Sequence, residues 1–341
     1  MIIYLGNNLS LHGNTPSSIE TLGNLLDKRY AMKRFSSKRN QVLRWLDMMY
    51  AIVRYHRTTN VVLIDTYSSL GFYYALGSAF LCRLLYVPYI PILRGGNLKS
   101  RLQHNPTLSR FVFGGANLLV APSGYLLSTF TEFGFSNIQY IPNSIEIGLY
   151  EMKKRECIMP KLLWVRSFHK VYSPLMAMRV FEKLLVHYPK AELAMVGPDK
   201  DGSFMECKEY ARKAGFGERI KFTGVLPKAE WHALSKLYDI FINTTTVDNT
   251  PVSVIEAMAL GLPVVSTNVG GVPYLIANNV DGVLVESGDV EKMIEKILFL
   301  IENSNQAMLI ASKARQKAEQ FDWNHVKSEW FELLDRFELK K

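Results

Sequence analysis

The sequence predicts an α/β protein built from two doubly wound parallel sheets, and three observations support this fold class. Short apolar runs alternate with segments of helical length along the whole chain, as in parallel sheets covered by helices on both faces. The chain has 341 residues, which is longer than one hydrophobic core usually supports, so we expect two domains. Polar segments follow the apolar runs, where such sheets bind ligands. Two such sheets facing each other across a cleft would hold a ligand between them.

Apolar runs of strand length occur in both halves of the chain. In the first half we predict strands at 2–5, 61–64, 89–93, 117–121 and 138–141. In the second half we predict them at 161–165, 191–196, 220–223, 240–243, 264–266 and 282–285. A charged stretch at 151–156 suits a linker, so we assign residues 1–150 to one domain and 151–321 to another. A last helix at about 322–341 is expected to pack back on the first domain.

The composition is that of a soluble globular protein, with 48% hydrophobic and 21% charged residues. Three widely separated cysteines have no zinc-binding spacing and an odd count for disulfides, which fits a reducing cytoplasm. The first residues lack a basic region and a long apolar stretch, so they indicate a strand rather than a signal peptide. The uncharged run 66–82 falls short of the roughly 20 apolar residues of a membrane-spanning helix.

Positive charge is concentrated in the first half of the chain. Residues 1–150 hold fourteen Lys and Arg against six Asp and Glu, and the net charge of the whole chain is +9. The segment 28–57 interleaves cations with apolar side chains, as in a basic amphipathic helix. Such a helix either lies on an anionic membrane surface or presents an ordinary solvated face, and the sequence leaves both open. Nucleic acid is not an expected partner, because no reading helix, zinc finger or ribonucleoprotein signature is present.

A short apolar helix at about 251–260 contains one carboxylate, Glu256. Thr250 suits the N-cap, Pro251 the first helical position and Gly261 the left-handed position after the end. An unpaired charge beside buried surface costs several kcal/mol, so Glu256 needs a polar partner. The first turn begins with Pro251, which has no N–H, and the free N–H groups of Val252 and Ser253 can bind an anion.

Two cations follow the strand predicted at 161–165. Arg166 and Lys170 combine a forked donor with a point charge, which suits a diphosphate, although a surface ion pair is the simpler alternative. His169 lies in the same loop, and Gly197 begins the turn after the next strand. One strand after the helix, Gly270 and Gly271 allow backbone to approach a ligand closely. Phosphate and hydroxyl recognition in one cleft is therefore predicted.

The segment 248–271 resembles the donor-binding signature of the retaining glycosyltransferases of family 4, also called glycosyl transferases group 1. These enzymes have the GT-B fold of two Rossmann-like domains. The segments 166–170, 197–198, 222–224 and 238–243 resemble the same family in the same order, so the resemblance covers nearly all of 160–285. The first half is similar only in layout and in its loop containing Gly13.

The resemblance implies a role for each matching residue. Glu256 would bind the ribose hydroxyls of the nucleotide, and Arg166 and Lys170 would neutralise the diphosphate leaving group. Asp248 stands eight positions before Glu256, where the family has a second acid that contacts the donor sugar. Arg94 stands where many relatives have a histidine near the reacting centre; arginine is no base at neutral pH, but it could hold a phosphate or the acceptor. The remaining predicted donor-binding residues are Gly270, Gly271, Gly13, Pro251, Val252, Ser253, Gly197 and His169.

The predicted function is therefore retaining transfer of a sugar from a nucleoside-diphosphate-sugar to a glycan or lipid-linked acceptor. The second domain would bind the donor and the first the acceptor, in cell-surface polysaccharide or glycoconjugate synthesis at the cytoplasmic face of the membrane. No metal or other cofactor is expected, and the acidic turn at 199–201 indicates a solvated loop rather than a metal site. Two alternatives stay open: a nucleotide-sugar epimerase of the same fold, and a nucleotide-sugar-binding protein without catalysis.

Overall fold

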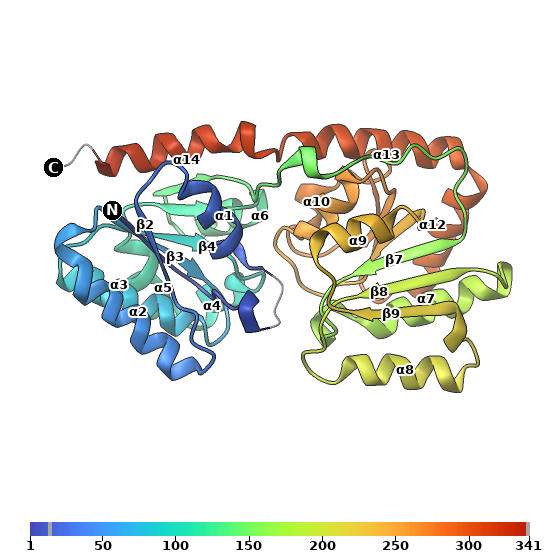
Figure 1. Cartoon of the computed structure of the whole chain (residues 1–341), viewed down its shortest axis with the longest axis horizontal. Coiled ribbons are helices and arrows are strands. Elements are labelled where there is room, and N and C mark those ends of the chain that lie inside the picture. The colour runs from blue at the N-terminus through green and yellow to red at the C-terminus, as the bar shows by residue number, and fades with distance from the viewer. Residues whose placement is uncertain (13–15, 339–341) are drawn as a thin grey trace. The chain divides into compact units, whose positions relative to one another are not determined.

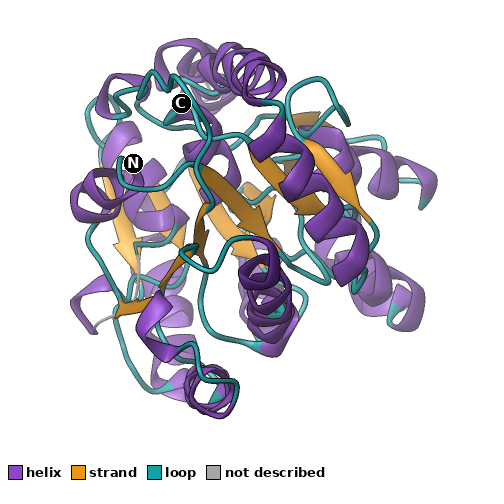
Figure 2. Cartoon of the chain, turned by 90° about the vertical axis from the view of Figure 1, so that its right-hand side faces the viewer, coloured by secondary structure: helices purple, strands orange, loops and turns teal. Residues whose placement is uncertain are grey.

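The computed structural model describes residues 1–12 and 16–338. The chain divides into two compact units, one formed by residues 1–144 with the C-terminal segment from 326, the other by residues 145–325. Each unit contains a six-stranded parallel sheet as its inner layer, covered by helices (Figure 1, Figure 2). The predicted fold class, two doubly wound α/β units, is confirmed.

The sheet of the first unit has the strand order β2-β1-β3-β4-β5-β6, so the order reverses between β1 and β3. Ile3 of β1 pairs with Lys33 on one side and Val62 on the other, and all pairings in the sheet are parallel. The strands are β1 (Ile2–Leu5), β2 (Met32–Phe35), β3 (Val61–Thr66), β4 (Tyr89–Leu93), β5 (Leu119–Ala121) and β6 (Ile138–Tyr140).

Strand β2 was not predicted from the sequence. The prediction of one amphipathic helix over 28–57 was wrong. The segment contains the edge strand β2 and, after a turn, the helix α2 (Gln41–Tyr55). Lys33 and Arg34 lie in the strand, where an edge position tolerates charge because only one side pairs. Asn40 caps α2 by accepting hydrogen bonds from the N–H groups of Val42 and Leu43, at 2.9 and 3.1 Å.

Helices cover both faces of this sheet. Phe113 joins three of them by edge-on ring contacts, with centroids 6.1 Å from Phe72 and 4.9 Å from Phe130. The last helix packs on this unit: Tyr30 donates to a carboxylate oxygen of Asp335 at 2.6 Å. The helices of the unit are α1 (Ser18–Leu26), α2, α3 (Phe72–Leu84), α4 (Leu98–His104), α5 (Pro106–Gly114), α6 (Gly124–Glu132) and α14 (Trp323–Glu338), with the 3-10 turns η1 (Ser10–His12) and η2 (His56–Thr58).

The sheet of the second unit has the order β12-β11-β10-β7-β8-β9, so the order reverses between β7 and β10. Phe241 of β10 pairs with Leu163 on one side and Val264 on the other. The strands are β7 (Lys161–Val165), β8 (Glu192–Val196), β9 (Ile220–Gly224), β10 (Ile240–Asn243), β11 (Val264–Thr267) and β12 (Val283–Val285).

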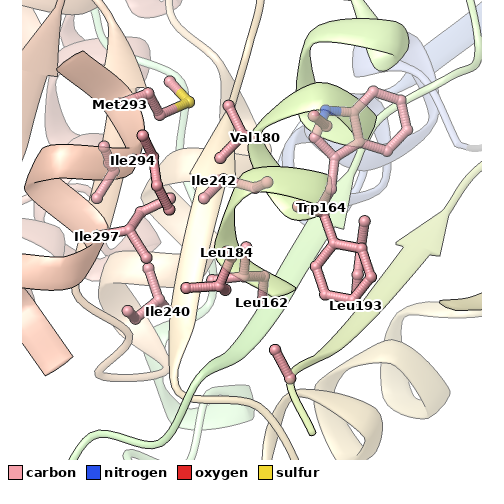
Figure 3. Close-up of a cluster of buried hydrophobic side chains, with 14 of the residues drawn as sticks. Leu162, Trp164, Val180, Leu184, Leu193, Ile240, Ile242, Met293, Ile294 and Ile297 are labelled. Carbon is pink, nitrogen blue, oxygen red and sulfur yellow. The ribbon is translucent and has the colours of Figure 1, made fainter. Parts of the chain in front are cut away.

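Both faces of this second sheet are buried, which explains why its strands are continuous apolar runs. On one face Ile242 of β10 lies among Val180, Leu184 and Ile297 (Figure 3). Each such side chain contributes about 1.5–3 kcal/mol when fully buried. The helices are α7 (Pro174–His187), α8 (Ser203–Lys213), α9 (Lys228–Ser235), α10 (Val252–Ala259), α11 (Val272–Leu275), α12 (Val290–Glu302) and α13 (Ser304–Glu319), with the 3-10 turns η3 (Ile147–Leu149), η4 (Lys170–Tyr172) and η5 (Gly217–Arg219). Within the described ranges, no helix is both long and apolar enough to cross a membrane.

Candidate active site

The carboxyl ends of β7 and β10 meet where the strand order of the second sheet reverses. Ligands of doubly wound sheets bind at such a reversal, because the loops after the two strands diverge and leave a crevice. Arg166 follows β7 directly, and the loop 244–250 follows β10. The predicted diphosphate cation and the predicted donor-binding loop therefore occupy the position where this fold binds ligands.

Arg166 and Asp248 form an ion pair at this reversal. The guanidinium also donates from Nε to the side-chain oxygen of Asn243, at 3.4 Å, and lies 4.8 Å from the ring centre of Tyr172. The two side chains are 14% and 13% exposed, so the pair is largely buried but still reachable. Burial raises the pKa of Asp248, and the Arg166 cation opposes that rise. Arg166 is thus fixed in orientation with part of its surface open.

Two glycines bring the segment after β11 against the loop that carries Asp248. A Cβ on Gly270 would stand 2.1 Å from the carbonyl oxygen of Asp248, and one on Gly271 would stand 1.7 Å from that of Asn249. Gly270 also has a φ of +53°, which favours glycine. The N–H of Gly271 donates to the Asp248 carbonyl at 3.1 Å. The glycine pair, predicted to contact ligand, therefore makes its closest contacts with the loop itself.

Gly197 has a similar role beside Arg166. Its φ is +148°, and a Cβ there would stand 1.8 Å from the carbonyl oxygen of Arg166. The N–H of Arg166 donates to Val196, and that of Gly197 donates to Gly224. Any other residue at 197 would push the backbone of Arg166 away from β8.

His169 and Lys170 lie in the same loop after β7, three and four residues after Arg166. The side chain of Lys170 is exposed, and its backbone N–H donates to Asp201 at 2.9 Å. Nδ1 of His169 accepts from the N–H of Val171 at 3.1 Å. The Ser203 hydroxyl and the Lys170 N–H lower the pKa of Asp201 to about 2. Asp201 therefore holds this loop in place, and Lys170 keeps a solvated ammonium.

The acidic turn at 199–201 is organised by its own backbone. Asp199 accepts from the N–H of Gly202 at 2.9 Å, and Asp201 accepts from the Ser203 hydroxyl at 2.5 Å. In the part of the chain that the structure describes, no group of three or more His, Cys, Asp or Glu is placed to hold a metal ion.

Glu256 lies on α10 with its side chain 6% exposed, and two donors meet one of its oxygens. The hydroxyl of Tyr150 donates to Oε1 at 2.8 Å and the ammonium of Lys228 at 2.6 Å. Burial and the Glu256 charge raise the pKa of Tyr150. The ring of His232 lies 4.4 Å from that of Tyr150, and burial lowers the pKa of this histidine. The polar partner that Glu256 requires is thus a Tyr–Lys pair.

The first turn of α10 differs from its expected form. The helix begins at Val252 with Pro251 as N-cap, and Pro251 makes no side-chain cap. Thr250 was expected as the N-cap, but Pro251 has extended backbone, with φ −68° and ψ 109°, so it takes the N-cap position and the helix begins one residue later. Ser253 has a buried hydroxyl with no hydrogen-bond partner. At the other end Gly261 has a φ of +72°, as the sequence predicts.

Arg94 of the first unit lies in a buried polar network at the end of β4. Its Nε donates to Oδ1 of Asp65 at 3.0 Å, its Nη2 donates to the hydroxyl of Tyr4 at 3.4 Å, and its Nη1 donates to Asn143. Tyr4 donates to the same Asp65 oxygen at 3.0 Å. The Arg94 and Asp65 side chains are 9% and 0% exposed. Protein groups therefore hold this guanidinium. Gly13 lies outside the described residues.

Sequence comparison finds a family model that matches the part of the chain that contains this site. Residues 159–317 match the family glycosyl transferases group 1, over a little under half of the chain, and this stretch contains every site residue of the second unit named above except Tyr150. Over this stretch, the chain is similar to the glycosyl transferases group 1.

Curated relatives match mainly this region of the chain. Sulfoquinovosyl transferase SQD2 of Arabidopsis thaliana is 31% identical over 153 residues, which are 43% of this chain and 28% of that protein. The amylovoran biosynthesis glycosyltransferase AmsK of Erwinia amylovora is 29% identical over 163 residues, 46% of this chain and 37% of that protein. The chain thus spans less than half the length of these relatives.

The likeness to solved structures extends over both units. The crystal structure of HepE from Anabaena in complex with UDP aligns with a TM-score of 0.77, covering 98% of this chain and 100% of that one at 17% identity. This likeness identifies the fold as GT-B, with two Rossmann-like units. It carries no conclusion about the ligand of the present chain.

The structure brings together some predicted residues and adds others. Arg166, Asp248, Gly270 and Gly271 meet within one set of contacts. Sequence reasoning missed Tyr150 and Lys228, which contact Glu256 from 106 and 28 positions away and follow no spacing rule. It also missed Asp65; the one available signal was a lone acid at the end of a buried strand.

Proposed function

We propose that the chain is a retaining glycosyltransferase that uses a nucleoside-diphosphate-sugar as donor. The observation that carries the proposal is the Arg166–Asp248 pair at the strand-order reversal of the second unit. Close by in the sequence lies α10, with its buried carboxylate Glu256. The Arg166 cation and the carboxylates of Asp248 and Glu256 all lie in the stretch that matches the glycosyl transferases group 1.

The proposed step breaks the bond between the anomeric carbon of the sugar and the diphosphate oxygen. The electron pair stays on the diphosphate, and the acceptor hydroxyl forms the new bond to carbon as it loses its proton. Arg166 and Lys170 stabilise the charge that develops on the departing diphosphate, which lowers the barrier more than it tightens donor binding. Two cations supply this stabilisation, so we expect no metal requirement.

In this proposal Glu256 accepts hydrogen bonds from the ribose hydroxyls, and Asp248 contacts the donor sugar. Arg94 of the first unit holds a phosphate or the acceptor. The remaining donor-binding residues are those predicted from the sequence. Uridine nucleotides are the first donors to test, because the solved structure of HepE contains UDP. The acceptor in this proposal is a glycan or a lipid-linked molecule, in polysaccharide or glycoconjugate synthesis at the cytoplasmic face of the membrane. The name of AmsK, an amylovoran biosynthesis glycosyltransferase, agrees with a biosynthetic role.

A binding and turnover experiment tests the proposal. We expect UDP, GDP or ADP to raise the melting temperature, since a ligand at a hundred times its dissociation constant adds about 2.7 kcal/mol of stability. Glu256→Ala should reduce that shift, whereas Glu302→Ala, which changes an exposed glutamate at the end of α12, should leave it unchanged.

Turnover then separates the proposed enzyme from its alternatives. Transfer should require an acceptor and persist in EDTA. Release of an altered sugar nucleotide from donor alone would instead indicate an epimerase. Tight nucleotide binding without turnover over a panel of donors and acceptors would indicate a binding protein.

A further inference from the structure

The exposed apolar side chains of the first unit are concentrated on one part of its surface. Thirteen large apolar side chains of this unit are exposed within the described ranges, and all but Tyr140 lie between residues 42 and 108. In the second unit the exposed apolar residues are scattered from 149 to 309. Single exposed apolar residues are normal, but a contiguous group marks an interaction surface.

Helix α2 is apolar on two faces. Met48, Met49 and Ile52 are buried in the core of the unit. Leu46, Tyr50 and Val53 recur at helical spacing and are 48%, 60% and 50% exposed. The core requires the first set only, so the second set is free to serve contact with something outside the unit.

Trp45, the residue before Leu46 on α2, lines an open apolar groove. The groove has a volume of about 490 Å³ and is lined by Trp45 of α2, Tyr73, Leu76 and Phe80 of α3, and Leu108 and Phe111 of α5. Gly77 forms its floor: a Cβ there would stand 2.7 Å from the indole nitrogen of Trp45. Its lining is hydrocarbon and aromatic rings.

Positive charge surrounds this surface. Residues 28–110 contain fourteen Lys and Arg but only two acids, Asp47 and Asp65, and Asp65 is buried against Arg94. Six of the cations are exposed on α2, α3, α5 or the turns that flank α2: Lys38, Arg39, Arg54, Arg57, Arg83 and Arg110. Apolar side chains inside a rim of exposed cations complement a layer that is anionic outside and hydrocarbon inside.

We propose that α2, α3 and α5 form a docking surface for an anionic lipid bilayer. The stripe Leu46, Tyr50 and Val53 enters the boundary between headgroups and acyl chains, together with Trp45 at the groove. The exposed cations contact the anionic headgroups. This proposal concerns the first unit alone and does not rest on the proposed sugar transfer, so a failure of either leaves the other standing.

The fluorescence of Trp45 gives a direct readout in the intact chain. Trp45 is 36% exposed, whereas the other four tryptophans are at most 9% exposed. Phosphatidylcholine vesicles containing phosphatidylserine should shift the emission to shorter wavelength, and lipids brominated on the acyl chain should quench it. Trp45→Phe should remove both effects without abolishing co-sedimentation. Vesicles of phosphatidylcholine alone should give a much smaller effect, as should about 1 M salt, where the Debye length is roughly 3 Å.

One variant and its control test the apolar contribution to membrane binding, and a second variant and its control test the contribution of the positive charges. Leu46→Ser/Tyr50→Ser/Val53→Ser should lose most co-sedimentation, whereas Val186→Ser/Met205→Ser, exposed apolar sites of the second unit, should lose none. Arg54→Gln/Arg57→Gln should weaken binding about fivefold per charge at low salt, while Lys190→Gln/Lys213→Gln should not.

Three results would overturn the proposal. The first is equal binding to anionic and neutral vesicles. The second is an unchanged Trp45 emission on vesicles that do sediment the protein. The third is a stable dimer in sedimentation equilibrium that the stripe variant dissociates, which would identify the surface as an interface between two copies.

Discussion

Each unit contains an Arg–Asp pair near the carboxyl end of its parallel sheet, yet the two pairs differ in exposure and in partners. Arg94 and Asp65 are 9% and 0% exposed, and Tyr4 donates to the carboxylate while Asn143 accepts from the guanidinium. Arg166 and Asp248 keep 14% and 13% of their surface, on a loop held by glycine contacts. The Arg94–Asp65 pair is therefore part of the core of the first unit, whereas the Arg166–Asp248 pair of the second unit leaves Arg166 accessible to a ligand.

The electrostatics of the two carboxyl groups are alike, and the difference lies in their surroundings. Burial raises the pKa of both carboxyl groups, and each arginine opposes the rise. In the first unit the second oxygen of Asp65 is buried and has no hydrogen-bond partner among the described residues. We infer that the Arg94–Asp65 pair acts mainly on stability and the Arg166–Asp248 pair mainly on turnover.

The largest expected effect is on the stability of the first pair. Asp65→Ala leaves the Arg94 guanidinium buried without its counter-charge, and we expect a loss of about 3–5 kcal/mol in the free energy of unfolding. Chemical denaturation measures it. Asp27→Ala, which removes only the surface pair with Arg34, should cost less than about 1 kcal/mol.

A double variant sharpens this test. Asp65→Leu/Arg94→Met removes both charges, so it should recover much of the lost stability. If the recovered protein keeps its turnover, Arg94 acts through the fold. If turnover is still lost, Arg94 also contacts a substrate, as the sequence analysis proposed.

The next largest effect concerns the Arg166–Asp248 pair and the rate of turnover. Arg166→Ala should lower kcat by about 10²–10³-fold, the loss typical when one group that stabilises transition-state charge is removed. Donor affinity should fall less, because the charge on the diphosphate develops in the transition state. Steady-state kinetics separates the two, with Arg179→Ala, an exposed arginine of α7, as control. A loss confined to KM would contradict the inferred role.

The smallest expected effect concerns the stability contribution of Asp201, a third carboxylate of the second unit. The pKa of Asp201 is lowered to about 2, so its contribution to stability is present above the unfolded value near 4 and disappears as the pH falls through about 2. Asp201→Asn should cost about 1 kcal/mol at pH 7, after allowance for solvent screening. The difference from wild type should shrink between pH 4 and 2 in denaturation curves. A difference independent of pH would show that charge is not involved.

The sequence predicted the fold class well because buried parallel strands leave a simple signature. Runs such as 162–165 and 240–242 are apolar on both faces, and only helices on both sides allow that. The edge strand β2 carries Lys33 and Arg34 and pairs on one side only, so it lacks this signature and was taken as helix.

The site was predictable to the extent that its residues are close in the sequence. The turn that follows α10 at Gly261 could be read from local rules, and the ligand edge of the sheet could be inferred from strand order. The contacts of Tyr150 and Lys228 with Glu256 depend on how distant segments pack, and so does the burial that separates Arg94 from Arg166. No local pattern contains that information.

The two donors on Glu256 have a consequence for affinity. One carboxylate oxygen already receives Tyr150 and Lys228, so a ribose hydroxyl that donates to Glu256 must either use the other oxygen or displace one of them. Nucleotide binding at this helix is then an exchange of hydrogen bonds, whose net gain is about 1 kcal/mol rather than the full strength of a new bond. Selection among nucleotides would rest on what surrounds Glu256 more than on Glu256 itself.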